Sequence, residues 1–375
     1  MSKRISEIDM AKGVGILYVI SRHIAELTGV SVYNPGLYKV FNIYAECWMV
    51  MFLLLSGYVY RSKGGILKNY KSKLKTLGVG YCGYFLFFCI TYGIRYLLIE
   101  HMDPGLFLTN CFHNFIAVPD FNIWTWSAYK NMMDYAYVPF WYLAQLFNAF
   151  LLFIPIHKYC EKRKGNSKLV AAIALLASSM VWYTINAQDV LTFTFAAGVS
   201  YFTIITNIVG FAGLLMLGSL LKDRQIFSFE RFSLKSFGLS SLFVVVMFAL
   251  YNGKYSMQFG NWGPYGIWSI PISTILGIAL TYSVSWILHG LKQMKPIEAG
   301  LTYCGRSSLD LLLMHFGLAE IFCYVLGFWQ PVYDTKYSAE YYQPWHFAVI
   351  WLLTLSVIII LLHIKKWWQR KRQDL

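Results

Sequence analysis

Two ionisable residues near the start of the sequence have the spacing of a polar path that enters a membrane. Lys12 and His23 are eleven residues apart, and eleven helical steps of about 100° return to within about 20° of the starting direction, so both lie on one helix face. At about 1.5 Å per residue they are separated by about 16 Å along the axis. This predicts a cation at the mouth that can hold an anionic donor, and a deeper imidazole that takes a proton near neutral pH. The alternative is that Lys12 is a snorkelling topology marker and His23 a hydrogen-bonded packing residue.

Four further ionisable side chains fall within apolar segments, namely Arg22, Glu46, Asp310 and His315. A charged group at the centre of a bilayer costs at least about 2.5–3.5 kcal/mol on insertion scales, so such residues usually face the interior of a helix bundle and have a function. Glu46 can pair with Arg22, which removes two of these costs at once. Asp310 lies four residues after Arg306, and an ion pair between them is an alternative to a catalytic role. His315 needs a hydrogen-bond partner.

The elements that position these residues are predicted to be membrane-spanning helices. The sequence has 375 residues, of which 57% are hydrophobic and 13% are charged, whereas about 25% of the residues of a soluble domain are charged. A spanning helix needs about 20 mostly apolar residues. Ten segments qualify: 11–30, 40–60, 77–99, 138–156, 169–186, 204–221, 237–251, 265–289, 307–328 and 346–363. We therefore expect an all-α, polytopic bundle of about ten transmembrane helices that forms a single membrane domain over residues 1–375.

The charge distribution predicts the orientation of this bundle. The formal net charge is +14, and alternate connecting segments together with both ends of the chain hold 26 of the 32 Lys and Arg residues. Short cationic loops remain in the cytoplasm, so both termini are expected there, including a basic tail at 365–375. The same charges are suited to the anionic headgroups of the lipid bilayer, and we do not expect the protein to bind nucleic acid.

One predicted outer segment, 100–137, is too polar to span the membrane and is rich in aromatic residues. It is expected to fold as an interfacial or re-entrant cover over the outer face, or to form an ordinary aromatic belt. The segment 191–203 can lengthen the sixth helix or lie at the interface. The seven cysteines show no paired spacing and are interpreted as small core residues, so no metal site is predicted.

Five short motifs follow one another along the chain. They are Arg4, Asp9, Lys12 and His23; Ser56, Gly57 and Tyr58; Lys68, Lys71, Lys73 and Lys75; Trp141, Tyr142 and Leu143; and Gly305, Ser308, Leu309 and His315. In identity and order they resemble the motifs of the acyltransferase family 3 membrane proteins, a bacterial group that O-acylates carbohydrates and other cell-envelope molecules. The ten-residue interval between the cation and the histidine of the first motif is kept here.

The resemblance implies a membrane-bound O-acetyltransferase of the bacterial cytoplasmic membrane. It implies acyl-CoA, most simply acetyl-CoA, as the donor substrate, with no permanently bound cofactor. The acceptor would be a hydroxyl of a cell-envelope or exported carbohydrate. His23 would act as the general base or form an acyl intermediate. Asp310 or Glu46 would orient it, and Arg22 would stabilise the oxyanion.

The resemblance also implies a donor site and an acceptor site. The donor-binding residues would be Lys12, Lys68, Lys71, Lys73, Arg306 and Ser56. Ser56 can instead serve close helix packing. Trp141 and His315 are assigned to acceptor binding or to structure.

A transporter or flippase for a sugar-linked or small polar solute is the competing function class, because buried His, Glu and Asp side chains fit a proton relay equally well. The sequence shows no internal repeat and no pair of helices broken by Gly or Pro, which argues against a transporter. A non-catalytic sensor explains neither the row from Lys12 to His23 nor the basic inner face.

Overall fold

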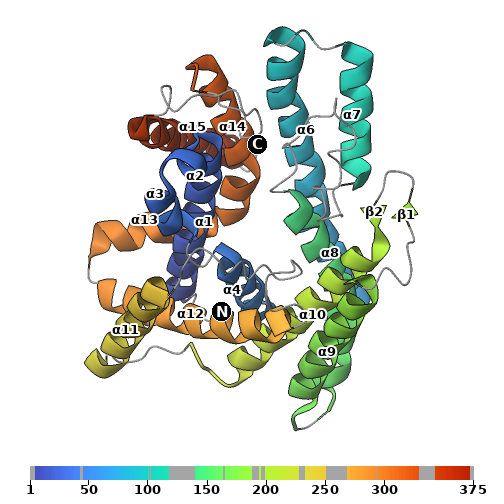
Figure 1. Ribbon diagram of the computed structural model, residues 1–375. Helices are drawn as coiled ribbons and strands as arrows, with labels where there is room; N and C mark the ends of the chain where they lie inside the picture. The colour runs from blue at the N-terminus through green and yellow to red at the C-terminus, as the bar shows by residue number, and fades with distance from the viewer. Residues whose placement is uncertain are drawn as a thin grey trace.

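The computed structural model describes residues 5–371 except 43–44, 100, 102, 118–139, 164, 188–193, 196–198, 228–232, 251–267, 293 and 329–342. The elements of the first part of the chain are α1 (Ser6–Leu27), α2 (Val30–Tyr33), α3 (Pro35–Asn42), α4 (Ala45–Tyr58), α5 (Ile66–Lys73), η1 (Leu74–Gly78), α6 (Val79–Gly93), η2 (Ile94–Ile99), α7 (Pro104–Ala117), α8 (Phe140–Glu161) and α9 (Ser167–Ala187). A two-residue hairpin of β1 (Thr194–Phe195) and β2 (Val199–Ser200) follows. The remaining elements are α10 (Tyr201–Asp223), α11 (Leu234–Leu250), α12 (Ser269–Leu291), α13 (Lys295–Arg306), α14 (Ser308–Val325) and α15 (Pro344–Lys371) (Figure 1).

Apolar helices dominate the described residues. Five of them are long and apolar enough to cross a membrane: Ile66–Thr91, Tyr142–Glu161, Ile270–Leu291, Ser308–Val325 and Pro344–Lys371. Three shorter apolar helices are Trp48–Tyr58, Ser167–Trp182 and Leu234–Met247. The prediction of a helical membrane protein is thereby confirmed, whereas the count of ten spans and the cytoplasmic placement of both termini stay predictions.

The first helix is the element that positions the candidate residues, and other helices surround it. α1 packs against α4, α12, α13 and α14, and also contacts α3 and α15. Ile16, Ile20 and Ile24 recur every four residues and therefore lie on one helix face. They are buried in an apolar cluster with residues of α14 and α15. The polar residues of α1 are thus carried on a helix that is fixed by apolar packing.

Two helix crossings depend on glycine because the backbones touch. A Cβ atom on Gly13 of α1 or on Gly305 of α13 would overlap the backbone of the facing helix. α4 and α10 cross in the same way at Gly57 and Gly218. A side chain at these positions would force the helices apart, as at the small-residue crossings of other membrane bundles. Gly57 and Gly305, which belong to two of the sequence motifs, therefore have a packing role.

The basic segment and the third predicted span form one continuous helix. α5, the π-helical turn η1 and α6 follow one another without a break, so the lysines at 68–75 lie on a helix rather than in a loop. α7 runs beside α6 (Figure 1) and places Phe107 against Gly93. The predicted outer segment 100–137 thus contains a helix that packs on α6, and its second half lies outside the described residues.

Candidate active site

His23 of α1 and His315 of α14 form a buried, hydrogen-bonded pair. His23 Nδ1 lies 2.8 Å from His315 Nε2, and His315 Nδ1 lies 3.0 Å from the carbonyl oxygen of Leu311. His315 is completely buried and His23 is 9% exposed. The ring of Phe316 stands edge-on to both imidazoles. Two segments far apart in the sequence therefore meet in a polar contact inside apolar surroundings.

The hydrogen-bond partners determine the tautomers when both imidazoles are neutral. A carbonyl oxygen only accepts, so His315 Nδ1 carries the proton that it donates to Leu311, and His315 Nε2 is an acceptor. His23 Nδ1 is then the donor between the two rings, which leaves the lone pair of His23 on Nε2. A lone pair on a positioned imidazole is what a general base or a nucleophile needs.

Asp310, one of the two carboxylates that we expected to orient His23, does not contact it in the described structure. Asp310 pairs with Lys365 of α15, with 2.9 Å between Oδ1 and Nζ. The side chain of Glu46 lies outside the described residues, and so does its expected pairing with an arginine. His315, assigned to acceptor binding or structure, occupies the position next to His23 Nδ1.

Arg306 is paired differently from the sequence-based expectation. α13 ends at Arg306 and α14 begins two residues later, so Arg306 and Asp310 do not share one helix and the i,i+4 geometry is absent. Arg306 Nε instead lies 3.2 Å from Asp9 Oδ2 on α1. This ion pair sits beside the glycine crossing of α1 and α13, so it helps to fix the N-terminal end of α1.

A second set of ion pairs fixes the same end of α1 to α12. Glu7 Oε1 lies 2.9 Å from His289 Nδ1 and 3.1 Å from Lys292 Nζ. Burial alone would raise the pKa of the Glu7 carboxyl, but the hydrogen bonds from His289 and Lys292 outweigh burial and hold this pKa below its usual value. Glu7 therefore remains an anion that ties α1 to α12 at neutral pH.

Lys73 is the predicted donor-binding lysine that is turned towards aromatic side chains. Its Nζ atom lies 3.6 Å from the ring centroid of Phe150 and 5.6 Å from that of Tyr60. Lys12 and Lys63 are close enough to Lys73 to repel it electrostatically. No carboxylate forms an ion pair with Lys73 in the part of the chain that the structure describes. An enclosed cation among other cations favours the binding of an anion, because an uncompensated charge is costly away from bulk water.

The remaining predicted site residues are distributed between the surface and the core. Lys68 and Lys71 are exposed. Ser56 and the hydroxyl of Tyr142 form a hydrogen bond. Two of the sequence motifs therefore meet between α4 and α8. The side chain of Trp141 lies outside the described residues.

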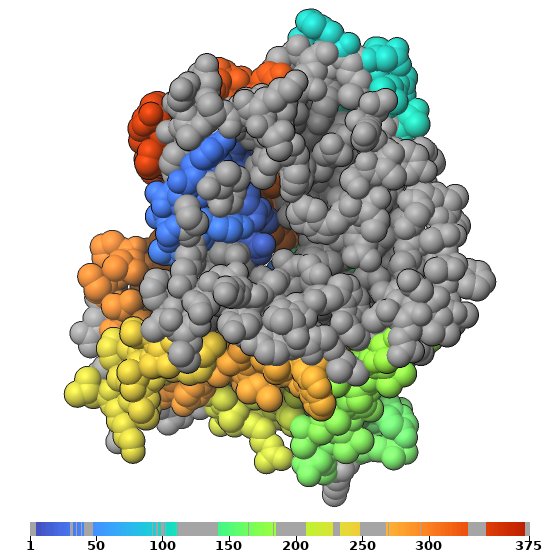
Figure 2. All heavy atoms as spheres, in the orientation of Figure 1, coloured from blue at the N-terminus to red at the C-terminus, as the bar shows by residue number. Residues whose placement is uncertain are grey.

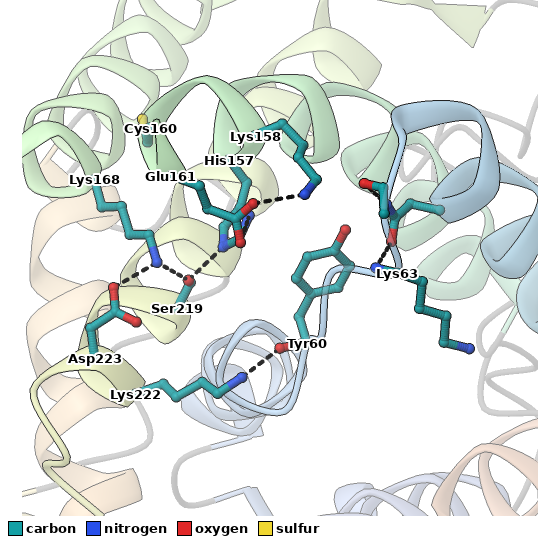
Figure 3. Close-up of polar contacts among 12 residues, drawn as sticks. Tyr60, Lys63, His157, Lys158, Cys160, Glu161, Lys168, Ser219, Lys222 and Asp223 are labelled. Carbon is teal, nitrogen blue, oxygen red and sulfur yellow. Dashed lines mark hydrogen bonds and ion pairs between the residues drawn. The ribbon is translucent and has the colours of Figure 1, made fainter. Parts of the chain in front are cut away.

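A polar network joins the ends of α8, α9 and α10 near Tyr60 (Figure 3). His157 Nε2 lies 2.9 Å from Ser219 Oγ, and its Nδ1 lies 3.6 Å from a carboxylate oxygen of Glu161. Lys168 Nζ bridges Ser219 Oγ at 3.1 Å and Asp223 Oδ2 at 2.6 Å. This network was not predicted from the sequence, because all its members except Ser219 fall in or beside segments predicted to be cytoplasmic loops, where solvated charges are expected.

Arg22 has a carboxylate partner on its own helix. Arg22 Nε lies 3.2 Å from Glu26 Oε1, four residues later on α1. The sequence analysis overlooked Glu26, although the i,i+4 spacing from Arg22 was a usable signal. It also overlooked Glu320, a carboxylate on α14 that is only 2% exposed. Both lie on the two helices that supply the histidine pair.

The fold and the site define a class: a helical membrane protein that has a buried imidazole pair between two of its helices. Over residues 5–371 the sequence matches the acyltransferase 3 family, described as an acyltransferase domain, and the chain belongs to this family. The resemblance inferred from the motifs is thus confirmed, and acyl transfer follows as the general activity.

No curated protein and no solved structure matches the chain. Among the described residues, no three His, Cys, Asp or Glu side chains gather as a possible metal site.

Proposed function

We propose that the protein transfers an acyl group, most simply acetyl from acetyl-CoA, to a hydroxyl of a cell-envelope or exported carbohydrate at the bacterial cytoplasmic membrane. The observation that supports this most is the His23–His315 pair, whose tautomers leave a lone pair on His23 Nε2. Acyl transfer to an alcohol needs such a group, because a neutral hydroxyl is a weak nucleophile until a base takes its proton.

In a direct transfer, His23 Nε2 takes the proton of the acceptor hydroxyl as the hydroxyl oxygen attacks the thioester carbonyl. The carbon–sulfur bond then breaks, and the CoA thiolate receives the proton back from His23. The products are an acyl ester and free CoA. His23 Nδ1–H stays hydrogen-bonded to His315 throughout, which keeps the ring in one orientation. A positioned base contributes typically about 10²–10⁴-fold to the rate.

In a two-step transfer, His23 Nε2 attacks the thioester carbonyl, the carbon–sulfur bond breaks, and CoA leaves as the thiolate, which takes up the proton that the acceptor hydroxyl loses in the second step. The acyl-imidazole formed on His23 then passes its acyl group to the acceptor hydroxyl. The two routes differ in one observable species. Mass spectrometry of the peptide that contains His23, after an acid quench of protein incubated with acetyl-CoA alone, detects an acyl adduct only in the two-step route.

The donor is proposed to lie with its phosphates at the N-terminal end of α1. Lys12, Lys63 and Lys73 form a group of mutually repelling cations there. CoA carries several phosphate charges, and cations of this kind bind phosphate as point charges. The exposed Lys68 and Lys71 on the same helix as Lys73 add to the positive field that attracts the donor.

The decisive experiment is transfer of radiolabel from acetyl-CoA by the purified protein in lipid nanodiscs. The probe for the acceptor is the envelope carbohydrate fraction from cells that lack the protein. His23→Ala should lower the rate by about 10²–10⁴-fold, whereas His363→Ala, which changes an exposed histidine of α15, should not.

Retention of wild-type activity by His23→Ala would show that His23 is not the base. With the protein reconstituted in sealed vesicles instead, movement of the carbohydrate across the membrane without incorporation of label would favour the transporter or flippase class.

A further inference from the structure

Three polar side chains form a closed group at the end of α1 that is remote from Lys12. Arg22 Nε donates to Glu26 Oε1 at 3.2 Å, and the hydroxyl of Tyr38 on α3 donates to the same oxygen at 2.8 Å. Arg22 and Tyr38 also hydrogen-bond each other. We call Arg22, Glu26 and Tyr38 the α1–α3 triad.

The α1–α3 triad lies next to the proposed base. Glu26 follows His23 by three residues, which places it about 4.5 Å further along the helix axis and about 60° around it. Arg22 is the sequence neighbour of His23, and its side chain is directed to Glu26. The triad is therefore about one helical turn beyond His23, on the side opposite to the cations at the N-terminal end of α1.

The protein covers the charged side chains of the triad only partly, in contrast to those of the histidine pair. The side chain of Arg22 is 23% exposed and that of Glu26 is 34% exposed. Charged groups on a helix of a membrane bundle avoid lipid and face either the bundle interior or water. Part of the blue segment that holds α1 to α3 lies at the molecular surface in Figure 2. The exposed parts of the triad are thus available to a water-soluble ligand.

The short helix α3 holds Tyr38 in place. Asn34 Oδ1 accepts the backbone N–H of Leu37 at 3.1 Å and so caps the start of α3. At its other end, the hydroxyl of Tyr18 on α1 bonds the carbonyl oxygen of Val40. Burial, and then the charge of Glu26, raise the pKa of Tyr38, so its hydroxyl stays protonated and remains a donor.

The chemistry of the triad matches the hydroxyl groups of a carbohydrate. Both hydrogen bonds to Glu26 end on Oε1, which leaves Oε2 to accept a hydroxyl proton from a ligand. Arg22 places the N–H groups of a guanidinium directly beside Glu26. A phosphate-rich donor would be repelled by Glu26, whereas a polyol is complementary to adjacent donors and acceptors.

We infer that the α1–α3 triad is the acceptor-binding site, where Glu26 and Arg22 bind adjacent hydroxyls of a carbohydrate beside His23. This inference rests on the proposed function. Donor and acceptor then approach His23 from opposite ends of α1. Arg22 is a substrate-binding residue in this arrangement, because its pairing with Glu26 directs it away from the role of an oxyanion donor.

The test separates the Michaelis constants of the two substrates. Label transfer from acetyl-CoA to the envelope carbohydrate fraction is measured with Glu26→Gln and with Tyr38→Phe in nanodiscs. Glu26→Gln should raise the KM for the carbohydrate roughly tenfold, because a charged acceptor is lost. Tyr38→Phe, which removes one hydroxyl and keeps the Arg22–Glu26 pair, should raise it roughly threefold. The KM for acetyl-CoA should stay within about twofold in both, as expected for a site that does not touch the donor.

Matched controls make the same substitutions away from the site. Glu298→Gln on α13 removes a carboxylate that pairs with Lys295 at 3.7 Å, and Tyr159→Phe changes an exposed tyrosine of α8. Neither should change the KM for the carbohydrate.

Two failures are distinguishable. If the wild-type protein transfers no label to the carbohydrate fraction, the proposed function fails and the inference fails with it. If the wild type transfers label and His23→Ala does not, but Glu26→Gln and Tyr38→Phe leave the carbohydrate KM unchanged or raise both KM values equally, only the inference is overturned.

Discussion

His23 and His157 are both buried and hydrogen-bonded, yet their surroundings differ in kind. The contact of His23 Nδ1 is with another imidazole, that of His315, inside apolar packing. His157 contacts the hydroxyl of Ser219 with one ring nitrogen and faces the carboxylate of Glu161 with the other. One histidine is paired with another imidazole, and the other lies in a network of charged side chains.

This difference indicates which histidine is suited to chemistry. At His157, Nε2 is hydrogen-bonded to Ser219 Oγ and connects α8 to α10, whereas Nδ1 makes no hydrogen bond within the described residues and has a carboxylate oxygen of Glu161 3.6 Å away (Figure 3). At His23, one nitrogen is fixed by His315 and the lone pair of the other is unused within the pair. Burial and hydrogen bonding alone therefore do not identify a base, because a structural histidine has both. The distinguishing feature is the carboxylate of Glu161, which faces the second ring nitrogen of His157 and has no counterpart among the described contacts of His23.

The largest effect after loss of His23 itself is expected from its partner. His315→Ala should lower kcat about 10²-fold, because His23 loses the acceptor that fixes its tautomer and orientation. His315→Asn should recover part of the rate, since its amide oxygen can still accept from His23 Nδ1–H. Steady-state label transfer measures both variants. An unchanged kcat in His315→Ala would show that the imidazole pair is a packing feature.

His157→Ala should act on stability instead of catalysis. The substitution removes the hydrogen bond to Ser219 and the packing of a buried ring, while Ser219 keeps Lys168 and Glu161 keeps Lys158, so the free energy of unfolding should fall by about 1–3 kcal/mol. Thermal unfolding in detergent measures this loss, and kcat should stay within about twofold of the wild type, as for a residue away from the reacting atoms. A fall in kcat as large as that of His315→Ala would remove the contrast between the two histidines.

The sequence was sufficient for the class of fold and for placing Lys12 and His23 on one helix. The low share of charged residues predicted a helical membrane protein, and the eleven-residue interval predicted that Lys12 and His23 lie on one face of α1. These properties depend on composition and on the period of a single helix, and a single sequence contains both. The continuous α5–η1–α6 helix was not foreseen, because the basic segment reads as a loop when hydropathy alone is used.

The rest of the site depends on how helices are rotated against each other. The sequence showed that His315 needs a partner. Whether that partner is His23, Asp310 or Glu46 depends on how α14 is rotated about its own axis relative to α1. Close backbone crossings of the glycine type and apolar packing set that rotation, and both are tertiary properties. The pairing of Asp310 with Lys365, 55 residues later, is unreadable from sequence for the same reason.

Tyr60 contacts residues of both the His157 network and the proposed donor site. Its ring packs edge-on against His157, and Lys73 lies over the same ring. If Lys73 binds the donor, Lys73→Met should raise the KM for acetyl-CoA roughly tenfold, because a charged contact to phosphate is lost while the side chain keeps its packing. The KM for the carbohydrate should not change. Lys75→Met, two residues further and exposed, should change the acetyl-CoA KM by less than about twofold, since an exposed charge contributes little. If both variants raised the acetyl-CoA KM equally, Lys73 would contribute only to the general positive field. If Lys73→Met lowered stability and left the acetyl-CoA KM unchanged, Lys73 would belong to the structural region around His157.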